Sequence, residues 1–220
     1  MKIKLKENEL KHIIEESVKR LLKEYYRGPI YHATNIYGLY YMSLTNTLEP
    51  SGDDREGEGD GYNEKRHINY DDFICFTRDK NFNIAQDREQ VSSILTFNTE
   101  KLMKLRNGRL YPVNWANCKN NTNGYNEAEE RFYIDKIYPL SEYVEKIEII
   151  INENDLCNDS SLVDYASEGY RDKDDYIYDI YEKFEEKYED EKELLKNFNL
   201  YFIKLILKSP LGKKIAIINN

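Results

Sequence analysis

Segments of strand length that are rich in β-branched and aromatic residues recur between residues 30 and 151, and they constrain the fold more than any other feature of the chain. Polar loops or short stretches with helical spacing separate them, a pattern typical of an α+β domain built around a sheet. Helices are predicted at residues 36–44 and 99–105. Strands are predicted at residues 30–33, 72–77, 91–97, 110–115, 130–134 and 144–151.

Helical segments flank this core on both sides. Residues 7–26 carry apolar side chains at three- and four-residue steps, which predicts an amphipathic helix that either docks on the core or serves as a removable leader. Residues 176–207 are predicted to form one long helix with an acidic first half and an apolar second half, followed by a final strand at 214–218. The expected division is an N-terminal amphipathic helix over 1–28, a core over 29–151 and an acidic helical extension over 152–220.

The negative charge of the chain is concentrated in its C-terminal third. The net charge is −9, and residues 164–193 hold 13 acidic and 5 basic side chains, a local balance of −8. An acidic chain has no general attraction to the phosphate backbone of nucleic acids. Sequence-independent binding to nucleic acid is therefore disfavoured.

The cysteines and the hydropathy pattern indicate a cytoplasmic protein. Cys75, Cys118 and Cys157 are far apart and odd in number, so they are interpreted as free thiols in a reducing compartment. No apolar run approaches the length of a membrane span. The sequence also has neither a His-Glu-x-x-His pattern nor a glycine-rich phosphate loop, so no metal site is expected.

Three short motifs carry residues suited to catalysis. The first, at 31–35, reads Tyr-His-Ala-Thr-Asn and joins a predicted strand to a predicted helix. The second, at 74–79, reads Ile-Cys-Phe-Thr-Arg-Asp and ends a strand. The third, at 126–132, reads Asn-Glu-Ala-Glu-Glu-Arg-Phe and brings three carboxylates to the point where a loop enters a strand.

In this order the motifs resemble those of ADP-ribosyltransferases of the histidine class. In that family a strand with a His-x-Thr element precedes a helix, a second strand ends in small hydroxyl residues or a tyrosine, and a glutamate stands at the mouth of a later strand. The chain is also similar to uncharacterised phage and gut-bacterial proteins with a Phe-Thr-Arg-Asp run followed by Glu-x-Glu-Glu-Arg. The resemblance implies an ADP-ribosyltransferase-like split β-sheet core and a toxin-like mono-ADP-ribosyltransferase of phage or mobile-element type. Such an enzyme would use NAD as a substrate and modify a host protein or nucleic acid in the host cytoplasm.

The third motif would supply the catalytic carboxylate. Cleavage of the bond between nicotinamide and ribose creates an oxocarbenium-like centre, which a neighbouring carboxylate stabilises. We assign this role to Glu129, with Glu127 two residues earlier on the same strand face. Glu130 is the alternative: it faces the other side together with Phe132, and one of the two faces must be the core.

The first two motifs would bind NAD. The resemblance implies that His32 contacts the ribose hydroxyls, since a neutral imidazole both donates and accepts, and that Thr34 contacts the nicotinamide amide or the nearby ribose. Thr77 would support the glutamate or the ribose, and Arg78 would bind the diphosphate through its planar guanidinium. The residue that stacks on nicotinamide is left open among Tyr31, Tyr40 and Tyr70.

Two non-enzymatic functions are alternatives. The chain could be a virion or cargo protein on a transferase-like scaffold, because residues 1–24 resemble the amphipathic leaders of phage proteins. Leu22-Lys23-Glu24 also resembles the Leu-x-Glu site that the prohead proteases of large tailed phages cleave, which would imply packaging into a capsid. The acidic residues 164–193 suggest, less specifically, a nucleic-acid mimic that blocks a basic defence enzyme.

Overall fold

The computed structural model describes residues 11–17, 28–50, 73–78, 80, 91–105, 109–113, 129–134, 136–167 and 175–219. Several residues singled out in the sequence lie outside this part of the chain: Leu22, Lys23, Glu24, Tyr70, Cys118 and Glu127.

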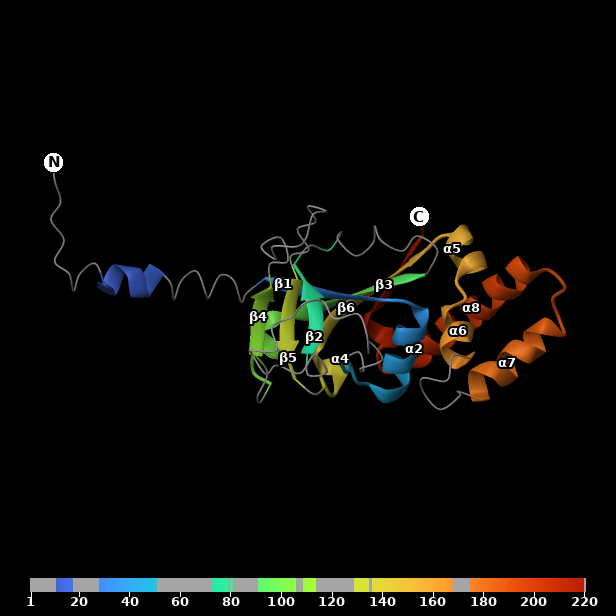
Figure 1. The fold of residues 1–220 in the computed structure, drawn as a ribbon, viewed down its shortest axis with the longest axis horizontal. Helices are drawn as coiled ribbons and strands as arrows, with labels where there is room; N and C mark the ends of the chain where they lie inside the picture. The colour runs from blue at the N-terminus through green and yellow to red at the C-terminus, as the bar shows by residue number, and fades with distance from the viewer. Residues whose placement is uncertain are drawn as a thin grey trace, which may run out of the picture.

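Within the described residues, seven strands form one sheet in the order β4-β5-β2-β1-β3-β6-β7 (Figure 1). Neighbouring strands are antiparallel, except that β6 and β7 run parallel. All the strands expected from the sequence are present, and their ends differ from the predictions by at most two residues. The bounds are β1 Pro29–Thr34, β2 Phe73–Thr77, β3 Ser92–Asn98, β4 Arg109–Val113, β5 Glu129–Tyr133, β6 Val144–Ile151 and β7 Ile215–Asn219.

Helices occupy several of the connections between the strands. Both core helices predicted from the sequence are confirmed, although the second is shorter than expected, and the α+β class is confirmed with them. None of the helices in the described part of the chain combines the length and apolar character needed to cross a bilayer. The bounds are α2 Ile36–Thr45, α3 Thr99–Leu102, α4 Leu140–Tyr143, α5 Glu153–Asn158, α6 Ser161–Ser167, α7 Asp175–Glu185, α8 Glu191–Lys208 and the 3₁₀ turn η5 Gly212–Lys214.

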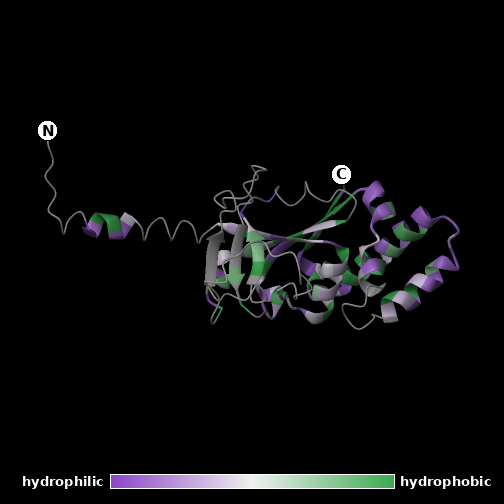
Figure 2. Cartoon of the chain, viewed as in Figure 1, coloured by the Kyte–Doolittle hydropathy of each residue, from purple (hydrophilic) through white to green (hydrophobic). Residues whose placement is uncertain are grey.

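One face of the sheet carries the hydrophobic core. Leu95 of β3 pairs with Ile147 of β6, and both side chains are fully buried. Helices α2 and α8 contribute to the same cluster, α2 through Leu39 and α8 through Phe202. Figure 2 shows hydrophobic residues along the central strands and hydrophilic residues over much of α7 and α8.

The single long helix predicted over residues 176–207 is wrong. Helix α7 ends at Glu185, and α8 begins only at Glu191. Asp190 starts α8, because its side chain accepts a hydrogen bond of 2.8 Å from the backbone nitrogen of Glu193. An aspartate followed three residues later by a glutamate is a known signal for a helix start, and it was available in the sequence.

The break allows α7 to fold back on α8 as a helical hairpin. The rings of Tyr181 and Phe184 on α7 make T-shaped contacts with the ring of Phe198 on α8, with centroid distances of 5.4 and 5.7 Å. Aromatic pairs at such distances add to the stabilisation that burial provides. The apolar second half of the predicted helix therefore packs against the first half as well as against the core.

Residues 152–219 share one core with residues 29–151. Tyr40 of α2 meets Phe202 of α8 edge-on at 4.8 Å, and β7 extends the sheet beside β6. The side chain of Asn199 on α8 donates to the carbonyl oxygens of Leu156 and Asp159, at 3.0 and 2.8 Å. The hydrophobic core and the sheet therefore continue across the domain boundary expected at residue 151.

The N-terminal helix is described over residues 11–17. It lies apart from the sheet in Figure 1, and the side chains of Ile13 and Ile14 are 48% and 53% exposed. The core does not cover these two side chains, and the remainder of the helix predicted over residues 7–26 lies outside the described residues, so docking on the core stays a prediction. Its role as a removable leader stays a prediction.

Candidate functional site

The three motifs lie on three neighbouring strands. Motif one is on β1, motif two on β2 and motif three on β5, and these strands are adjacent in the order β5-β2-β1. Tyr31 pairs with Thr77, which in turn pairs with Glu129. Residues almost a hundred positions apart in the chain thus form one row across three strands.

A second row lies on the opposite face of the same strands. The imidazole of His32 meets the ring of Phe76 edge-on, with centroids 5.9 Å apart, and Phe76 pairs with Glu130. Because successive residues of a strand face opposite sides, this row belongs to the core face, where Phe132 is fully buried. The predicted site is therefore divided: His32 and Thr77, expected to act together, lie on opposite faces.

The sheet opens between β1 and β2. The backbone register of these two strands consists of the pair Tyr31–Thr77, whereas β1 with β3, and β2 with β5, pair along their whole lengths. The sheet thus has two halves, β4-β5-β2 and β1-β3-β6-β7, which join near this pair.

His32 spans the opening. Its Nδ1 lies 2.9 Å from the carbonyl oxygen of Cys75. A carbonyl oxygen can only accept, so Nδ1 carries the hydrogen and donates it, and Nε2 of the neutral ring is the acceptor. Contrary to our expectation, His32 cannot offer both ring nitrogens to a ribose while this hydrogen bond is intact.

The His32 ring is half-buried, and this burial decides its charge. Loss of solvent disfavours the imidazolium and lowers the pKa of His32 below its ordinary value of 6.5, an effect that the hydrogen bond to Cys75 opposes only in part. The ring is therefore neutral at pH 7.

The start of α2 is held tightly against the end of β1. The side chain of Asn35 accepts a hydrogen bond of 2.9 Å from the backbone nitrogen of Gly38 and caps the helix. A β-carbon on Gly38 would lie 2.1 Å from Oγ1 of Thr34, so glycine is needed for this close approach. The Gly-Leu pair that follows the histidine motif thus has a packing role, since Leu39 is fully buried.

The second motif ends beside the start of β1. Thr77 is only 3% exposed. The guanidinium of Arg78 makes a long contact of 3.5 Å with the carbonyl oxygen of Gly28, which also accepts a hydrogen bond from the hydroxyl of Thr99. Arg78 is therefore near the edge where β1 begins, away from the Asn35 cap at the other end of that strand.

Of the three aromatic residues considered for stacking on nicotinamide, Tyr40 is excluded. It is 4% exposed and packs on Phe202, because its position on α2 faces the core. Tyr31 is half-buried and belongs to the row with Thr77 and Glu129.

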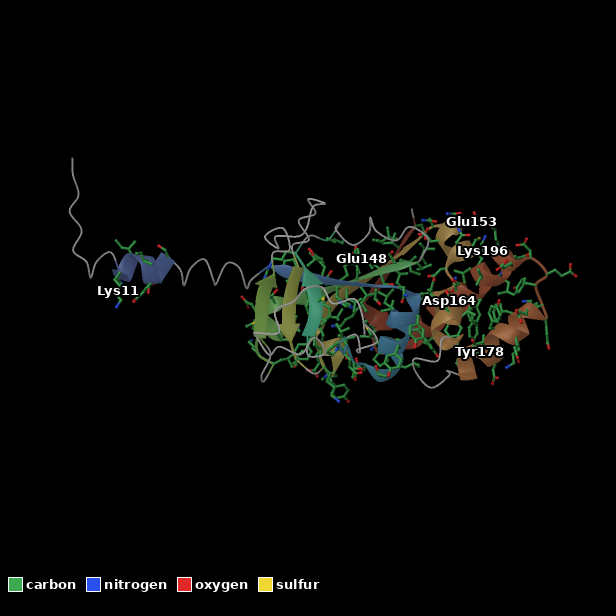
Figure 3. The ribbon with its side chains drawn as sticks, in the orientation of Figure 1. Lys11, Glu148, Glu153, Asp164, Tyr178 and Lys196 are labelled. Atoms are coloured by element: carbon green, nitrogen blue, oxygen red, sulfur yellow. The ribbon has the colours of Figure 1, made fainter. Side chains whose placement is uncertain are left out.

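An ion cluster that the sequence reasoning missed lies on the same face as Tyr31. Glu148 of β6, labelled in Figure 3, is 4% exposed. Its two oxygens bind Lys80 at 2.5 Å and Lys146 at 2.8 Å. Burial alone would raise the pKa of Glu148, but the hydrogen bonds and charges of the two lysines lower it below the ordinary value. A Lys-x-Glu spacing within an apolar strand was the available signal. Both oxygens are occupied, so this carboxylate has a structural role.

In the part of the chain that the structure describes, no three His, Cys, Asp or Glu side chains are grouped to hold a metal ion. Comparison with protein-family models, curated proteins and solved structures finds no match to this chain.

Proposed function

We propose that the protein is an NAD-dependent mono-ADP-ribosyltransferase that acts on a host macromolecule. One observation carries the proposal: the row Tyr31–Thr77–Glu129 brings all three catalytic motifs to neighbouring strands. The division of the sheet between β1 and β2 supports it further, since the family resemblance implies a split sheet.

The register favours Glu129 as the catalytic carboxylate. Position 129 lies on the face of Thr77, whereas position 130 lies on the face of the fully buried Phe132. A group that must approach a bound dinucleotide belongs on the face that is not filled by the core. Glu129 would stabilise the positive charge that develops on the ribose as nicotinamide departs with the bonding electrons. The nucleophile of the acceptor then attacks the ribose carbon and loses its proton.

The other residues of the motifs would bind and orient NAD. Tyr31, in the same row, would stack on nicotinamide, and Thr77 would support the carboxylate or a ribose hydroxyl. His32 lies on the core face, opposite this row, and its Nδ1 is held by Cys75, so it would hold β1 to β2 beside the site and would not contact the same ribose as Glu129. Arg78, which follows β2 and lies beside the start of β1, would contact the diphosphate. Thr34 shares the face of His32, so the contact with nicotinamide expected for it does not belong to this row.

A second candidate is a non-enzymatic virion or cargo protein on this scaffold. It is favoured by the exposed side chains of Ile13 and Ile14 on a helix that lies apart from the sheet. Apolar residues exposed on such a helix suit a partner surface, and packaging in a capsid would supply one.

Binding and cleavage of NAD by the full chain test the two candidates. Calorimetry should detect NAD binding, and chromatography should detect slow release of nicotinamide. We expect Glu129→Gln to retain binding but lose nicotinamide release, and Glu130→Gln to retain both if it folds. Glu145→Gln, a change at an exposed position of β6, is the matched control. Absence of NAD binding by the folded wild-type protein would rule out the enzyme and favour the virion protein.

A further inference from the structure

A shallow hollow of about 500 Å³ lies where β3 ends and β6 begins. Residues of α3, α4 and the 3₁₀ turn η5 surround it, together with one residue just after α3. It is lined by Lys101, Lys104, Ser141, Glu142, Tyr143 and Lys214. Half of the lining residues are therefore lysines, although the chain as a whole is strongly acidic.

Two of the lysines are held in place by the backbone on either side of Tyr143. Nζ of Lys214 donates to the carbonyl oxygen of Val144, and Nζ of Lys101 makes a long contact of 3.5 Å with the carbonyl oxygen of Glu142. An ammonium has three hydrogens, so each group keeps donors for a ligand. The ammonium of Lys214 is thus anchored before any ligand binds, and that of Lys101 lies close to the same segment of backbone.

The positive charge in the hollow is only partly offset, by Glu142, which also lines it, and by the charge of Glu145, which acts on Lys214. Among the described residues, no carboxylate lies within ion-pair distance of Lys101, Lys104 or Lys214. The carboxylate of Glu145 nearby accepts a hydrogen bond of 2.7 Å from the side chain of Asn98. Burial and the proximity of Lys101 lower the pKa of Lys214, although the charge of Glu145 acts in the opposite direction. An anion placed between these lysines would relieve their repulsion.

We propose that this hollow binds the phosphoryl group of a small phosphorylated compound. Three ammonium groups would provide the charge, and Ser141 and Tyr143, which also line the hollow, carry hydroxyls that can act as neutral donors. The volume falls within the range of pockets that hold small molecules. The site shares no residue with the row Tyr31–Thr77–Glu129, so the proposal does not depend on transferase activity.

Titration calorimetry of the full chain with sodium pyrophosphate and with inorganic phosphate, at ionic strength held constant with sodium chloride, tests this site. We expect pyrophosphate to bind, and Lys104→Gln to weaken binding at least about fivefold through the loss of one charge. Lys104 makes no described hydrogen bond, so this variant should fold normally. Lys204→Gln, which changes an exposed lysine on α8, is the control.

Adenosine monophosphate that competes with pyrophosphate would identify nucleotides as a source of the phosphoryl group. Absence of pyrophosphate binding, or equal weakening by Lys104→Gln and Lys204→Gln, would overturn the proposal.

Discussion

Nδ1 of His32 donates a hydrogen bond to the carbonyl oxygen of Cys75, joining β1 and β2 at the place where their backbone pairing ends. The imidazole is thus part of the sheet as well as part of the candidate site. A change at His32 will affect both the stability of the opening and the binding of a ligand there. Experiments on this residue must therefore separate the hydrogen bond from the charge.

The His32→Asn variant makes this separation, because the asparagine amide can still donate to Cys75 while it cannot titrate. The folded-state pKa of His32 is below the unfolded value, so the unfolded chain binds more protons between the two. The free energy of unfolding of the wild type should therefore fall as the pH drops below about 6.5, and the variant should lose this component. Urea unfolding between pH 8 and pH 5 measures it. If the free energy of unfolding changes with pH in the same way in both proteins, this component does not come from His32.

Glu148→Gln should destabilise the protein at pH 7 by about 1–3 kcal/mol, because two lysine ammonium groups lose the charge they share. Since the folded pKa of Glu148 is lowered, its contribution is present above the unfolded value and disappears as the pH falls through the folded value. The free energies of unfolding of the wild type and of Glu148→Gln should therefore converge as the pH is lowered. The exposed Glu145 of the same strand provides the control: Glu145→Gln should change the free energy of unfolding by no more than about 0.5 kcal/mol. Equal effects of the two changes would contradict the structural role of Glu148.

Phe202→Ala should destabilise the whole fold by about 3–5 kcal/mol, since the ring of this α8 residue is fully buried and packs against Tyr40 of α2. Leu207→Ala on the same helix should cost less than about 1 kcal/mol, because Leu207 is 38% exposed. Both values come from urea unfolding followed by circular dichroism. A separate unfolding step for residues 152–219 in the Phe202→Ala variant would show that these residues form an independent unit.

Gly38→Ala should destabilise the protein by about 1–3 kcal/mol, because the new methyl group would meet Oγ1 of Thr34. The higher helix propensity of alanine offsets about 1 kcal/mol of this loss. The double variant Gly38→Ala with Thr34→Ala should recover stability, since the blocking hydroxyl is gone. A double-mutant cycle from urea unfolding measures the coupling, and additive effects of the two changes would contradict the contact.

Two differences between the sequence-based predictions and the structure have different causes. The Asp190-x-x-Glu193 spacing marks the start of α8, yet the apolar pattern on both sides favoured one continuous helix. Tyr40 could not be separated from Tyr31 as a stacking residue, because both belong to the first motif region and only packing against Phe202 removes Tyr40 from solvent. The start of α8 is thus decided by a local cap, whereas the burial of Tyr40 depends on a distant segment of the chain.

The sequence by itself determined where the strands and the core helices lie, because alternation, β-branched composition and caps act over a few residues. It also determined which positions within one strand share a face, such as 130 and 132 in the third motif. Only the tertiary structure decided the strand order, and with it the pairing that puts Tyr31, Thr77 and Glu129 on one face and His32 on the other. Such pairing depends on the register between segments that are far apart in the chain, and a shift of one residue would have exchanged the two faces.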